Sequence, residues 1–278
     1  ETTVSMACEA GRRALENAKM SADEIDLILV STISSNVVIP CTACEVQKEL
    51  GAVNATCFDL SAACTGFVIA YNTALSYITA GIYKNVLVIG SESLSNLTNW
   101  KDRGTCILFG DGAGAAVVKA CDQKTYIPVT HSDGASGEAL KCRSRYDRNG
   151  LTKKVIPEEW MDDRYLMQMD GRAVFKFAVK SVPQAVEEVL DKNQIQKDEI
   201  VWYILHQANR RIVESVAKRL GESIEKFPMN LQEYGNTSSA SIPILLDEMN
   251  RSGKLKKGQK IVLAGFGAGL TWGASILE

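Results

Sequence analysis

The sequence predicts an α/β protein made of two similar halves, and three observations support this prediction. Apolar segments of strand length alternate with amphipathic segments of helix length along the chain. The motif Asp23–Ile25, followed by an apolar run, returns as Asp198–Ile200 with another apolar run behind it. With 278 residues, 46% of them hydrophobic, the chain can bury a large core. An internal duplication explains all three observations.

The first half is expected to span residues 1–121. Its helices end near Leu-Gly or Thr-Ala-Gly sequences, where glycine favours termination. Apolar spacing predicts helices at Cys8–Ala18, Cys41–Leu50 and Thr65–Ala80, and strands at Ile25–Thr32, Cys57–Leu60, Val86–Gly90, Cys106–Phe109 and Gly112–Val118.

The second half is expected at residues 171–278 and repeats the order helix, strand, helix. The corresponding elements are predicted at Phe175–Leu190, Val201–Leu205 and Arg210–Leu220. Residues 122–170, rich in glycine, charge and proline, are interpreted as a connection between the halves. The sequence opens at Glu1 inside a helical pattern, so we expect an opening strand to be missing from this chain.

Composition excludes several classes of function. The net charge is −2, with 31 basic and 33 acidic residues, so no global basic field indicates nucleic-acid binding. The apolar runs are too short to span a membrane. Eight cysteines without regular disulfide spacing favour a reduced cytoplasm. Cys41 and Cys44 are read as packing residues, because no second pair accompanies them.

A glycine-rich segment at Gly110–Ala115 resembles a nucleotide-binding fingerprint. That fingerprint requires a strand, a turn and a helix, with an acidic residue further on. Because Phe109–Gly114 has a near copy at Phe266–Gly269, we interpret the segment as a shared structural turn.

Cys64 is the first candidate for chemistry. It follows a predicted strand and opens an apolar helix, where helix N–H groups and the helix dipole would stabilise a thiolate and lower the pKa. Small neighbours leave room for a substrate. The alternative is a buried structural cysteine, as most free cysteines are.

His206 and Asn236 are the second and third candidates. His206 ends a buried strand, at the edge where α/β sheets place their sites. Asn236 lies in a turn before an apolar helix, and this turn matches the one that carries Cys64. The other histidine, His131, is in a loop and is interpreted as structural. A structural role for His206, or a simple turn at Asn236, remains the alternative for each residue alone.

Together these motifs resemble β-ketoacyl-acyl-carrier-protein synthase III, a family of thiolase fold. The matching sequences are Asp59–Phe67, His206–Asn209, Gly235–Ser238 and Gly267–Gly273, in the order and spacing of that family. The resemblance runs from Glu1 to Glu278 and implies a layered α-β-α-β-α core. Cys/His/Asn also separates this branch from thiolases (Cys/His/Cys) and from elongating synthases (Cys/His/His).

The resemblance implies a two-step reaction without a metal or redox cofactor. Cys64 would accept an acyl group from an acyl-CoA primer, with the N–H groups of Cys64 and Ala268 as oxyanion hole. Malonyl-carrier protein would then lose carbon dioxide and condense, with His206 and Asn236 donating to the enolate oxygen. Thiolase-fold enzymes are usually dimers, so a homodimer is expected.

The resemblance also assigns substrate contacts. The expected contacts with CoA and pantetheine are Arg103, Gly171, Phe175 and Asn209; the acyl pocket is assigned to Ile39 and Phe109. A basic docking patch for acidic carrier protein is expected from Gln207, Ala208, Asn209, Arg210, Arg211, Lys176 and Lys218. For the charged residues, a surface ion pair or a solvated helix face is the alternative.

Three other functions remain open at this stage. A type III polyketide synthase uses the same Cys/His/Asn set but extends malonyl groups bound to CoA. A papain-type hydrolase is less favoured because its cysteine motif is absent. A non-catalytic scaffold of the same fold is the third alternative.

Overall fold

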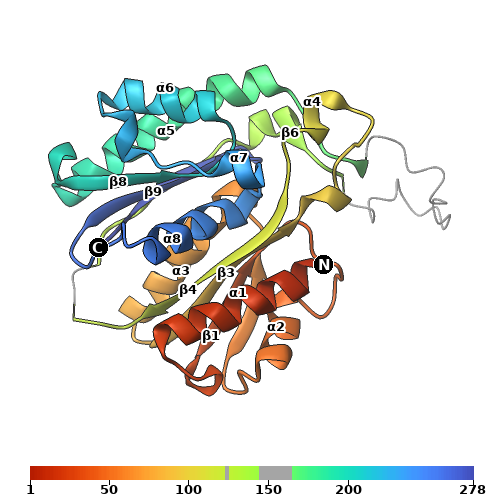
Figure 1. Ribbon diagram of the computed structural model, residues 1–278, viewed down its shortest axis with the longest axis vertical. Helices are drawn as coiled ribbons and strands as arrows, with labels where there is room; N and C mark the ends of the chain where they lie inside the picture. The colour runs from red at the N-terminus through yellow and green to blue at the C-terminus, as the bar shows by residue number, and fades with distance from the viewer. Residues whose placement is uncertain (123–124, 144–164) are drawn as a thin grey trace.

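A computed structural model describes residues 1–122, 125–143 and 165–278 of the chain. Figure 1 shows two sheets separated by helices and covered on both outer faces by further helices, which confirms the expected five-layer α/β architecture. The first half contains α1 (Thr3–Ala18), β1 (Leu27–Ser31), α2 (Thr42–Leu50), β2 (Thr56–Leu60), α3 (Gly66–Thr79), β3 (Asn85–Ser93), α4 (Arg103–Cys106) and β4 (Asp111–Lys119).

The second half repeats the helix and strand order. Its elements, with the short strands of the connection, are β5 (Val129–Ser132), β6 (Leu140–Lys141), β7 (Gln168–Met169), α5 (Gly171–Asn193), β8 (Ile200–Leu205), α6 (Arg210–Leu220), α7 (Leu231–Tyr234), α8 (Ser241–Arg251), β9 (Lys260–Gly267) and β10 (Thr271–Leu277).

The two main sheets have related topologies. The first has the order β2-β1-β3-β4, with β1, β2 and β3 parallel and β4 antiparallel. The second has the order β5-β10-β9-β8, with β8 parallel to β9 and β10 antiparallel to it. The pairs β1–β3 and β8–β9 therefore correspond, and their parallel carboxyl ends place a site at the same edge of each sheet.

Three apolar cores hold the layers together. Helices α1 and α2 pack on the outer face of the first sheet, and α5 and α6 on the outer face of the second. Helices α3 and α8 lie between the sheets, where fully buried side chains such as Phe67, Ile204 and Leu263 form the central core. Burial on both faces explains why the strands read as continuous apolar runs.

Local structure confirms that the two halves share a common plan. The strands β1 and β8 are each preceded by a 3₁₀ turn, closed by a glutamate that accepts from a backbone N–H three residues earlier: Glu24 from Ser21 and Glu199 from Gln196, both at 2.9 Å. Helices α2 and α6 both end at a left-handed glycine, Gly51 and Gly221, where a side chain would be strained.

The predicted strand at Cys106–Phe109 is wrong. Cys106 ends the short helix α4, and Phe109 makes only an isolated bridge with Asn236. Leu108 and Phe109 line a cavity and Ile107 is exposed, so hydrophobicity alone was misleading. The glycines of Gly110–Ala115 lead into β4, with no strand-turn-helix unit. A Cβ at Gly114 would lie 2.7 Å from the backbone of Ile244, so close packing explains this glycine.

The connection expected over 122–170 contributes to the second sheet. Val129–Ser132 forms β5 and pairs antiparallel with β10, and Val129 is buried in the outer core. Residues 144–164 of the same segment lie outside the described residues. Among those described, no helix combines the length and apolar character needed to cross a bilayer.

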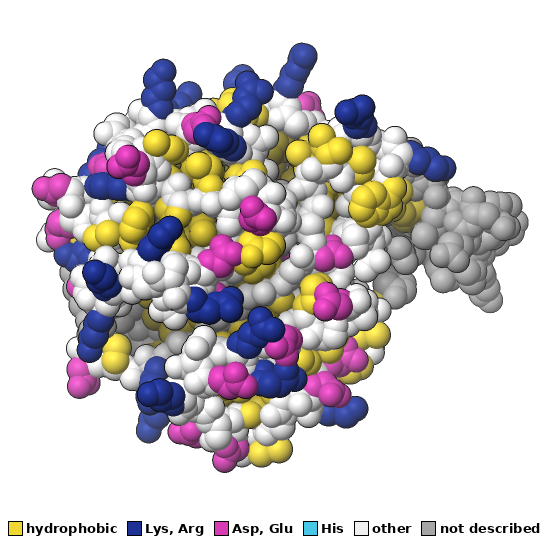
Figure 2. Space-filling view, viewed as in Figure 1, with side chains coloured by type: hydrophobic (Ala, Val, Ile, Leu, Met, Phe, Trp, Pro, Cys, Tyr) yellow, Lys and Arg dark blue, Asp and Glu magenta, His cyan; other side chains and the backbone are white. Residues whose placement is uncertain are grey.

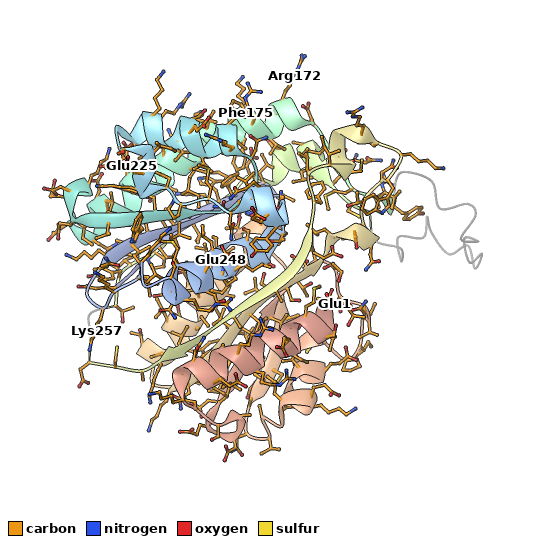
Figure 3. The ribbon with its side chains drawn as sticks, in the orientation of Figure 1. Glu1, Arg172, Phe175, Glu225, Glu248 and Lys257 are labelled. Atoms are coloured by element: carbon orange, nitrogen blue, oxygen red, sulfur yellow. The ribbon has the colours of Figure 1, made fainter. Side chains whose placement is uncertain are left out.

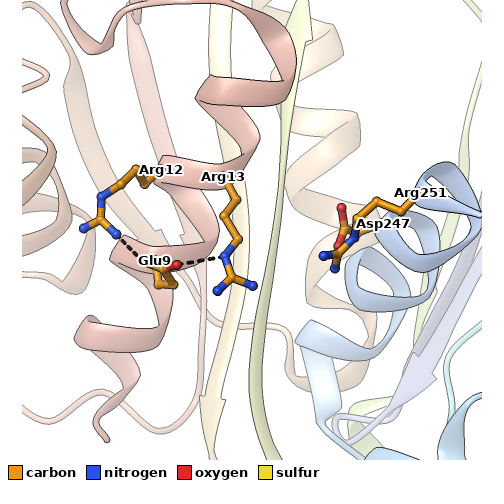
Figure 4. A network of polar contacts seen from close by, with 5 residues as sticks. All are labelled: Glu9, Arg12, Arg13, Asp247 and Arg251. Atoms are coloured by element: carbon orange, nitrogen blue, oxygen red, sulfur yellow. Dashed lines mark hydrogen bonds and ion pairs between the residues drawn. The ribbon is translucent and has the colours of Figure 1, made fainter.

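Charged side chains on the helix surfaces pair locally. On α1, Glu9 contacts both Arg12 and Arg13, and on α8, Asp247 contacts Arg251 (Figure 4). These exposed pairs are three or four residues apart within one helix, a spacing that contributes a few tenths of a kcal/mol. The charges on this face therefore stabilise helices and are unrelated to the site below.

Candidate active site

Two matched turns form the centre of the molecule. In the first half, Ala63 has a positive φ of 44° and is followed by Cys64 at the start of α3. In the second half, Ser238 has a φ of 49° and is followed by Ser239 just before α8. The two turns therefore have the same backbone conformation, with a positive φ at the same position. In this correspondence, the residue equivalent to Cys64 is Ser239.

Glycines let each turn approach a strand of the opposite half. A Cβ added at Gly90 of β3 would lie 2.4 Å from the carbonyl oxygen of Ser239. A Cβ at Gly267, the last residue of β9, would lie 2.7 Å from the Cβ of Cys64. Neither contact is tolerable, so each turn packs directly against a strand of the opposite half.

The three candidate catalytic residues line one cavity. Its volume is about 210 Å³, and Cys64, His206 and Asn236 reach it from the three different segments that the sequence singled out. It is also lined by Gly104, Leu108, Phe109, Leu140, Met169, Gly171, Val174, Phe175, Ala208, Asn209, Ile212, Phe266 and Gly267. A mostly apolar cavity with a few convergent polar groups is the usual form of a small-molecule site.

Cys64 is a thiol in this cavity. Burial raises its pKa to about 12, more than the nearby Ser238 side chain lowers it. The lowered pKa expected for Cys64 at a helix N-terminus is therefore not found, because burial raises the pKa of the thiol. The thiol must lose its proton as a substrate is attacked.

His206 is neutral and firmly held. It is 1% exposed, and burial lowers its pKa to about 3. Its Nδ1 lies 2.7 Å from Oγ of Ser241, and that hydroxyl is also 2.9 Å from the carbonyl oxygen of Ser238. The carbonyl can only accept, so Ser241 donates its one proton to it and accepts from the Nδ1–H of His206, which leaves Nε2 as the ring nitrogen that can accept a proton in the cavity.

Asn236 presents an amide of fixed orientation. The backbone N–H of Asn236 donates to the carbonyl of Leu108, and the backbone carbonyl of Asn236 accepts from the N–H of Gly110. Its Oδ1 accepts from the N–H of Ser238 at 2.9 Å, and a backbone N–H can only donate. The amide NH₂ is therefore free of this bond and available as a donor to a ligand in the cavity.

The other predicted substrate contacts divide into two groups. Gly171, Phe175, Asn209 and Phe109 line the cavity, and Ala268 adjoins Cys64 in a side cavity of about 50 Å³. Arg103 is exposed at the start of α4, beside the cavity-lining Gly104.

The predicted role of Ile39 in the acyl pocket is not supported within a single chain. Ile39 is 85% exposed and does not line the cavities around Cys64. The neighbouring Val37 and Val38 line a wider surface pocket instead.

The basic residues expected to dock carrier protein gather on α5 and α6. Figure 2 shows Lys and Arg side chains along the edge formed by these helices, and Figure 3 shows Arg172 projecting outward beside Phe175. Arg211 lies over the Phe175 ring, 5.8 Å from its centroid, at the entrance to the cavity. Arg210 pairs with Glu214, while Lys176 and Lys218 are exposed.

Gln207 cannot belong to a docking surface. It is 1% exposed, its Nε2 donates to the carbonyl of Leu205, and its Oε1 accepts from the N–H of Asn230. Its role is to hold the end of β8, which positions His206. His131 is structural as predicted: it pairs with Glu188 at 2.8 Å and stacks on Trp272.

Two residues near the site were not predicted from the sequence. Ser241, the partner of His206, was hidden among the serines of an expected turn. Glu92 is a fully buried carboxyl near the end of β3. The sequence does indicate that Glu92 is unusual, because a charged residue is rare next to the apolar residues of a buried strand.

Comparison with known proteins identifies the family. Residues 58–136 match 3-oxoacyl-[acyl-carrier-protein] synthase III, and residues 190–278 match its C-terminal region. The chain is 46% identical over its full length to β-ketoacyl-[acyl-carrier-protein] synthase III of Clostridium acetobutylicum, covering 84% of that protein. The chain belongs to the β-ketoacyl-[acyl-carrier-protein] synthase III family.

Solved structures agree with this assignment. Synthase III of Aquifex aeolicus matches the whole chain with a TM-score of 0.91 and 42% identity, and 85% of that chain is covered. A priming ketosynthase from the R1128 polyketide pathway matches with a TM-score of 0.91 and 37% identity, with 81% covered. The thiolase-like fold and the family predicted from the motifs are confirmed.

Proposed function

We propose that the protein is a β-ketoacyl-acyl-carrier-protein synthase III. It transfers an acyl group from acyl-CoA to Cys64, then condenses it with malonyl-acyl carrier protein to give a 3-oxoacyl-carrier protein and start fatty acid biosynthesis. The observation that carries this proposal is the meeting of Cys64, neutral His206 and the Asn236 amide in one apolar cavity.

In the first step, Sγ of Cys64 attacks the thioester carbonyl of the primer. The Cys64 proton must leave, and neutral His206 in the same cavity can accept it. The bond between the acyl carbon and CoA sulfur then breaks, and CoA departs as the thiol with that proton. The N–H groups of Cys64 and Ala268 would stabilise the oxyanion, with about 3 kcal/mol per donor.

In the second step, malonyl-carrier protein loses carbon dioxide. The electron pair of the broken carbon–carbon bond passes to the thioester oxygen, where the Asn236 amide donates a hydrogen bond. His206 donates a second one from Nε2 in its other tautomer, in which the Ser241 hydroxyl turns to donate to Nδ1. The resulting enolate carbon attacks the acyl group, and Cys64 sulfur leaves as a thiolate that takes up a proton from solvent to restore the thiol. A histidine that is neutral at the start of each step suits both, because Nε2 can accept the thiol proton in the first step and, in the other tautomer, donate a hydrogen bond in the second.

Substrate contacts follow from positions around the cavity. Phe175, Gly171 and Asn209 would line the pantetheine arm, and exposed Arg103 would meet the nucleotide end of CoA. Arg211, with Lys176, Lys218 and Arg210 nearby, would attract acidic carrier protein. We propose that no metal or further cofactor takes part, since the acyl groups arrive as thioesters.

We further propose a homodimer in the cytoplasm. Val38 and Ile39 are 63% and 85% exposed beside the surface pocket that contains Val37 and Val38, an apolar group that a second copy would cover. Eight cysteines without regular disulfide spacing suit a reducing compartment. Light scattering tests the dimer: wild type should have twice the chain mass, and Ile39→Asp should shift toward monomer.

The second candidate is a type III polyketide synthase-like enzyme, which would extend malonyl-CoA directly. The basic side chains of α5 and α6 favour carrier protein instead. Purified protein with an acyl-CoA should consume malonyl-carrier protein at least about tenfold faster than malonyl-CoA. Equal use of malonyl-CoA favours the polyketide alternative, and failure with both favours a non-catalytic member of the fold.

A further inference from the structure

Glu92 is a fully buried carboxyl group for which the reaction described above has no role. It is 0% exposed near the end of β3, where it contacts Ser239 of the Ser238–Ala240 turn. In the described part of the chain, no Lys, Arg or His forms an ion pair with it. An ionised carboxylate in such a place would cost several kcal/mol of solvation free energy.

The two oxygens of Glu92 have different partners. Oε2 accepts from the N–H of Ile33 at 3.0 Å, the hydroxyl of Ser34 at 2.7 Å and the hydroxyl of Thr32 at 3.2 Å. Oε1 has a hydroxyl partner in the other half of the protein, Ser239, at 2.9 Å. Glu92 therefore joins the loop after β1 to the turn that precedes α8.

Counting protons shows which atom donates at Oε1. Oγ of Ser239 is 2.9 Å from Oε1 of Glu92 and also 2.9 Å from the carbonyl oxygen of Ser31. Ser239 has one hydroxyl proton, and a carbonyl oxygen can only accept. Both contacts are satisfied when Ser239 donates to Ser31 and Glu92 itself donates to Ser239. Burial, which raises the pKa of Glu92, acts in the same direction.

We propose that Glu92 is an uncharged acid that positions the reaction centre: its hydroxyl donates to Ser239 and holds the Ser238–Ala240 turn against the Cys64 turn. The connection to His206 is short. Ser238 of the held turn accepts from Ser241, and Ser241 contacts Nδ1 of His206. The proposal rests on the proposed function only for its kinetic consequence.

Being uncharged also keeps Glu92 compatible with its neighbours. A carboxylate at Glu92 would raise the pKa of Cys64 further, because it would oppose the negative charge that develops on sulfur. The neutral acid holds the turn without that repulsion.

Two substitutions separate this proposal from a merely structural role. In Glu92→Gln, the amide NH₂ can donate to Ser239 while the amide oxygen accepts from Ile33, Ser34 and Thr32, as Oε2 of the neutral acid does. Glu92→Leu keeps a similar volume and removes the hydrogen bonds. An ionised Glu92 would instead accept hydrogen bonds at both oxygens, with Ser239 as a donor. In Glu92→Gln the amide NH₂ would then face the Ser239 hydroxyl, and both groups would be donors.

The kinetic test compares both variants in the two half-reactions. Glu92→Gln should keep condensation within roughly threefold of wild type, and Glu92→Leu should lose about tenfold or more. Acylation of Cys64 by acyl-CoA should change less than condensation in the leucine variant, because the displaced turn carries the partners of His206. Ser239→Ala should resemble Glu92→Leu. Glutamine as damaging as leucine would overturn the proposal.

A spectroscopic measurement tests the proton directly and needs no substrate. The infrared difference spectrum of wild type minus Glu92→Gln at neutral pH should contain the carbonyl stretch of one protonated carboxylic acid. A carboxylate signal in its place would overturn the proposal, even if Glu92→Leu fails to fold. Because this result is independent of turnover, it remains interpretable if the proposed function fails.

Discussion

The two matched turns have the same backbone form and opposite chemical character. The first places Cys64 among Ala62, Ala63 and Gly66 at the start of an apolar helix. The second carries Asn236, Ser238, Ser239 and Ser241, whose hydroxyl and amide groups bond to each other, to His206 and across to Glu92. One duplicated frame thus supplies a nucleophile on one side and oriented hydrogen-bond donors on the other.

This difference predicts that the two steps of the reaction can be separated by mutation. Residues of the first turn should control acylation, and those of the second should control decarboxylation and condensation. The predictions below test that division.

The largest effect is expected for Cys64→Ala. Condensation should fall by about 10⁴-fold or more, because no acyl-enzyme forms. Decarboxylation of malonyl-carrier protein should persist, since the second turn is intact. The measurement is product formation by mass spectrometry, with Cys57→Ala as matched control. Substantial condensation by Cys64→Ala would contradict the division.

The converse change, Asn236→Ala, should spare acylation. Removing one donor to the enolate should lower decarboxylation and condensation by about 10²- to 10³-fold. Single-turnover labelling of Cys64 by acyl-CoA should stay within about threefold of wild type. If acylation and condensation fall together, Asn236 supports the whole site and the two turns are not separable.

Gly267→Ala should disturb the first turn by pressing on it. The added methyl would lie 2.7 Å from Cβ and 3.1 Å from Sγ of Cys64. Acylation should fall by about 10²-fold, the usual cost of a 1 Å misplacement. Gly134→Ala is the matched control, because nothing lies within 4 Å of the methyl it adds. Equal rates for the two variants would show that the packing at Gly267 is loose.

The pH dependence of stability tests the neutral state of His206. Its pKa is about 3 in the folded chain, and an unfolded histidine has a pKa of about 6.5. Between these values the unfolded chain binds more protons, so this contribution is present above pH 6.5 and is lost as pH falls toward 3.

The free energy of unfolding in urea should therefore decrease below about pH 6.5, by on the order of 1 kcal/mol per pH unit. His206→Asn should flatten this decrease, and His131→Asn, at a part-exposed site, should not. An unchanged slope in His206→Asn would show that the imidazole is charged or exposed.

The smallest effect is expected at the entrance. Arg211→Ala removes a cation beside Phe175 and should raise the KM for malonyl-carrier protein by about three- to tenfold, more at low salt. The KM for acyl-CoA should change less. Arg251→Ala, on α8 and paired with Asp247, is the matched control. Equal effects of both variants would remove the docking role.

The sequence predicted those features that depend on local patterns. Arg210–Leu220 is the helix α6 with the same bounds, because its apolar spacing, its preceding Asn209 cap and its following glycine all agree. Cys64, His206 and Asn236 were found because each ends or begins an element at the active edge of a sheet. The equivalence of the two turns was visible because both precede an apolar helix.

Features that depend on long-range burial could not be predicted in this way. The pKa of Cys64 is governed by desolvation in a cavity built from both halves, which no local pattern records. Gln207 looked like a surface residue beside Asn209 but is buried by Asn230, 23 residues away. The apolar sequence of Cys106–Phe109 predicts a strand. In the fold, Phe109 makes only an isolated bridge with Asn236, which comes from the other half of the chain.

Mapping the acyl adduct tests the central claim most directly. Wild type and Asn236→Ala should be incubated with acetyl-, isobutyryl- and longer acyl-CoA, then digested and analysed by mass spectrometry. We expect a single acylated residue, Cys64, in wild type and in Asn236→Ala. We expect no acylated residue in Cys64→Ala. Acylation of another cysteine, or no adduct with any acyl-CoA, would contradict the account.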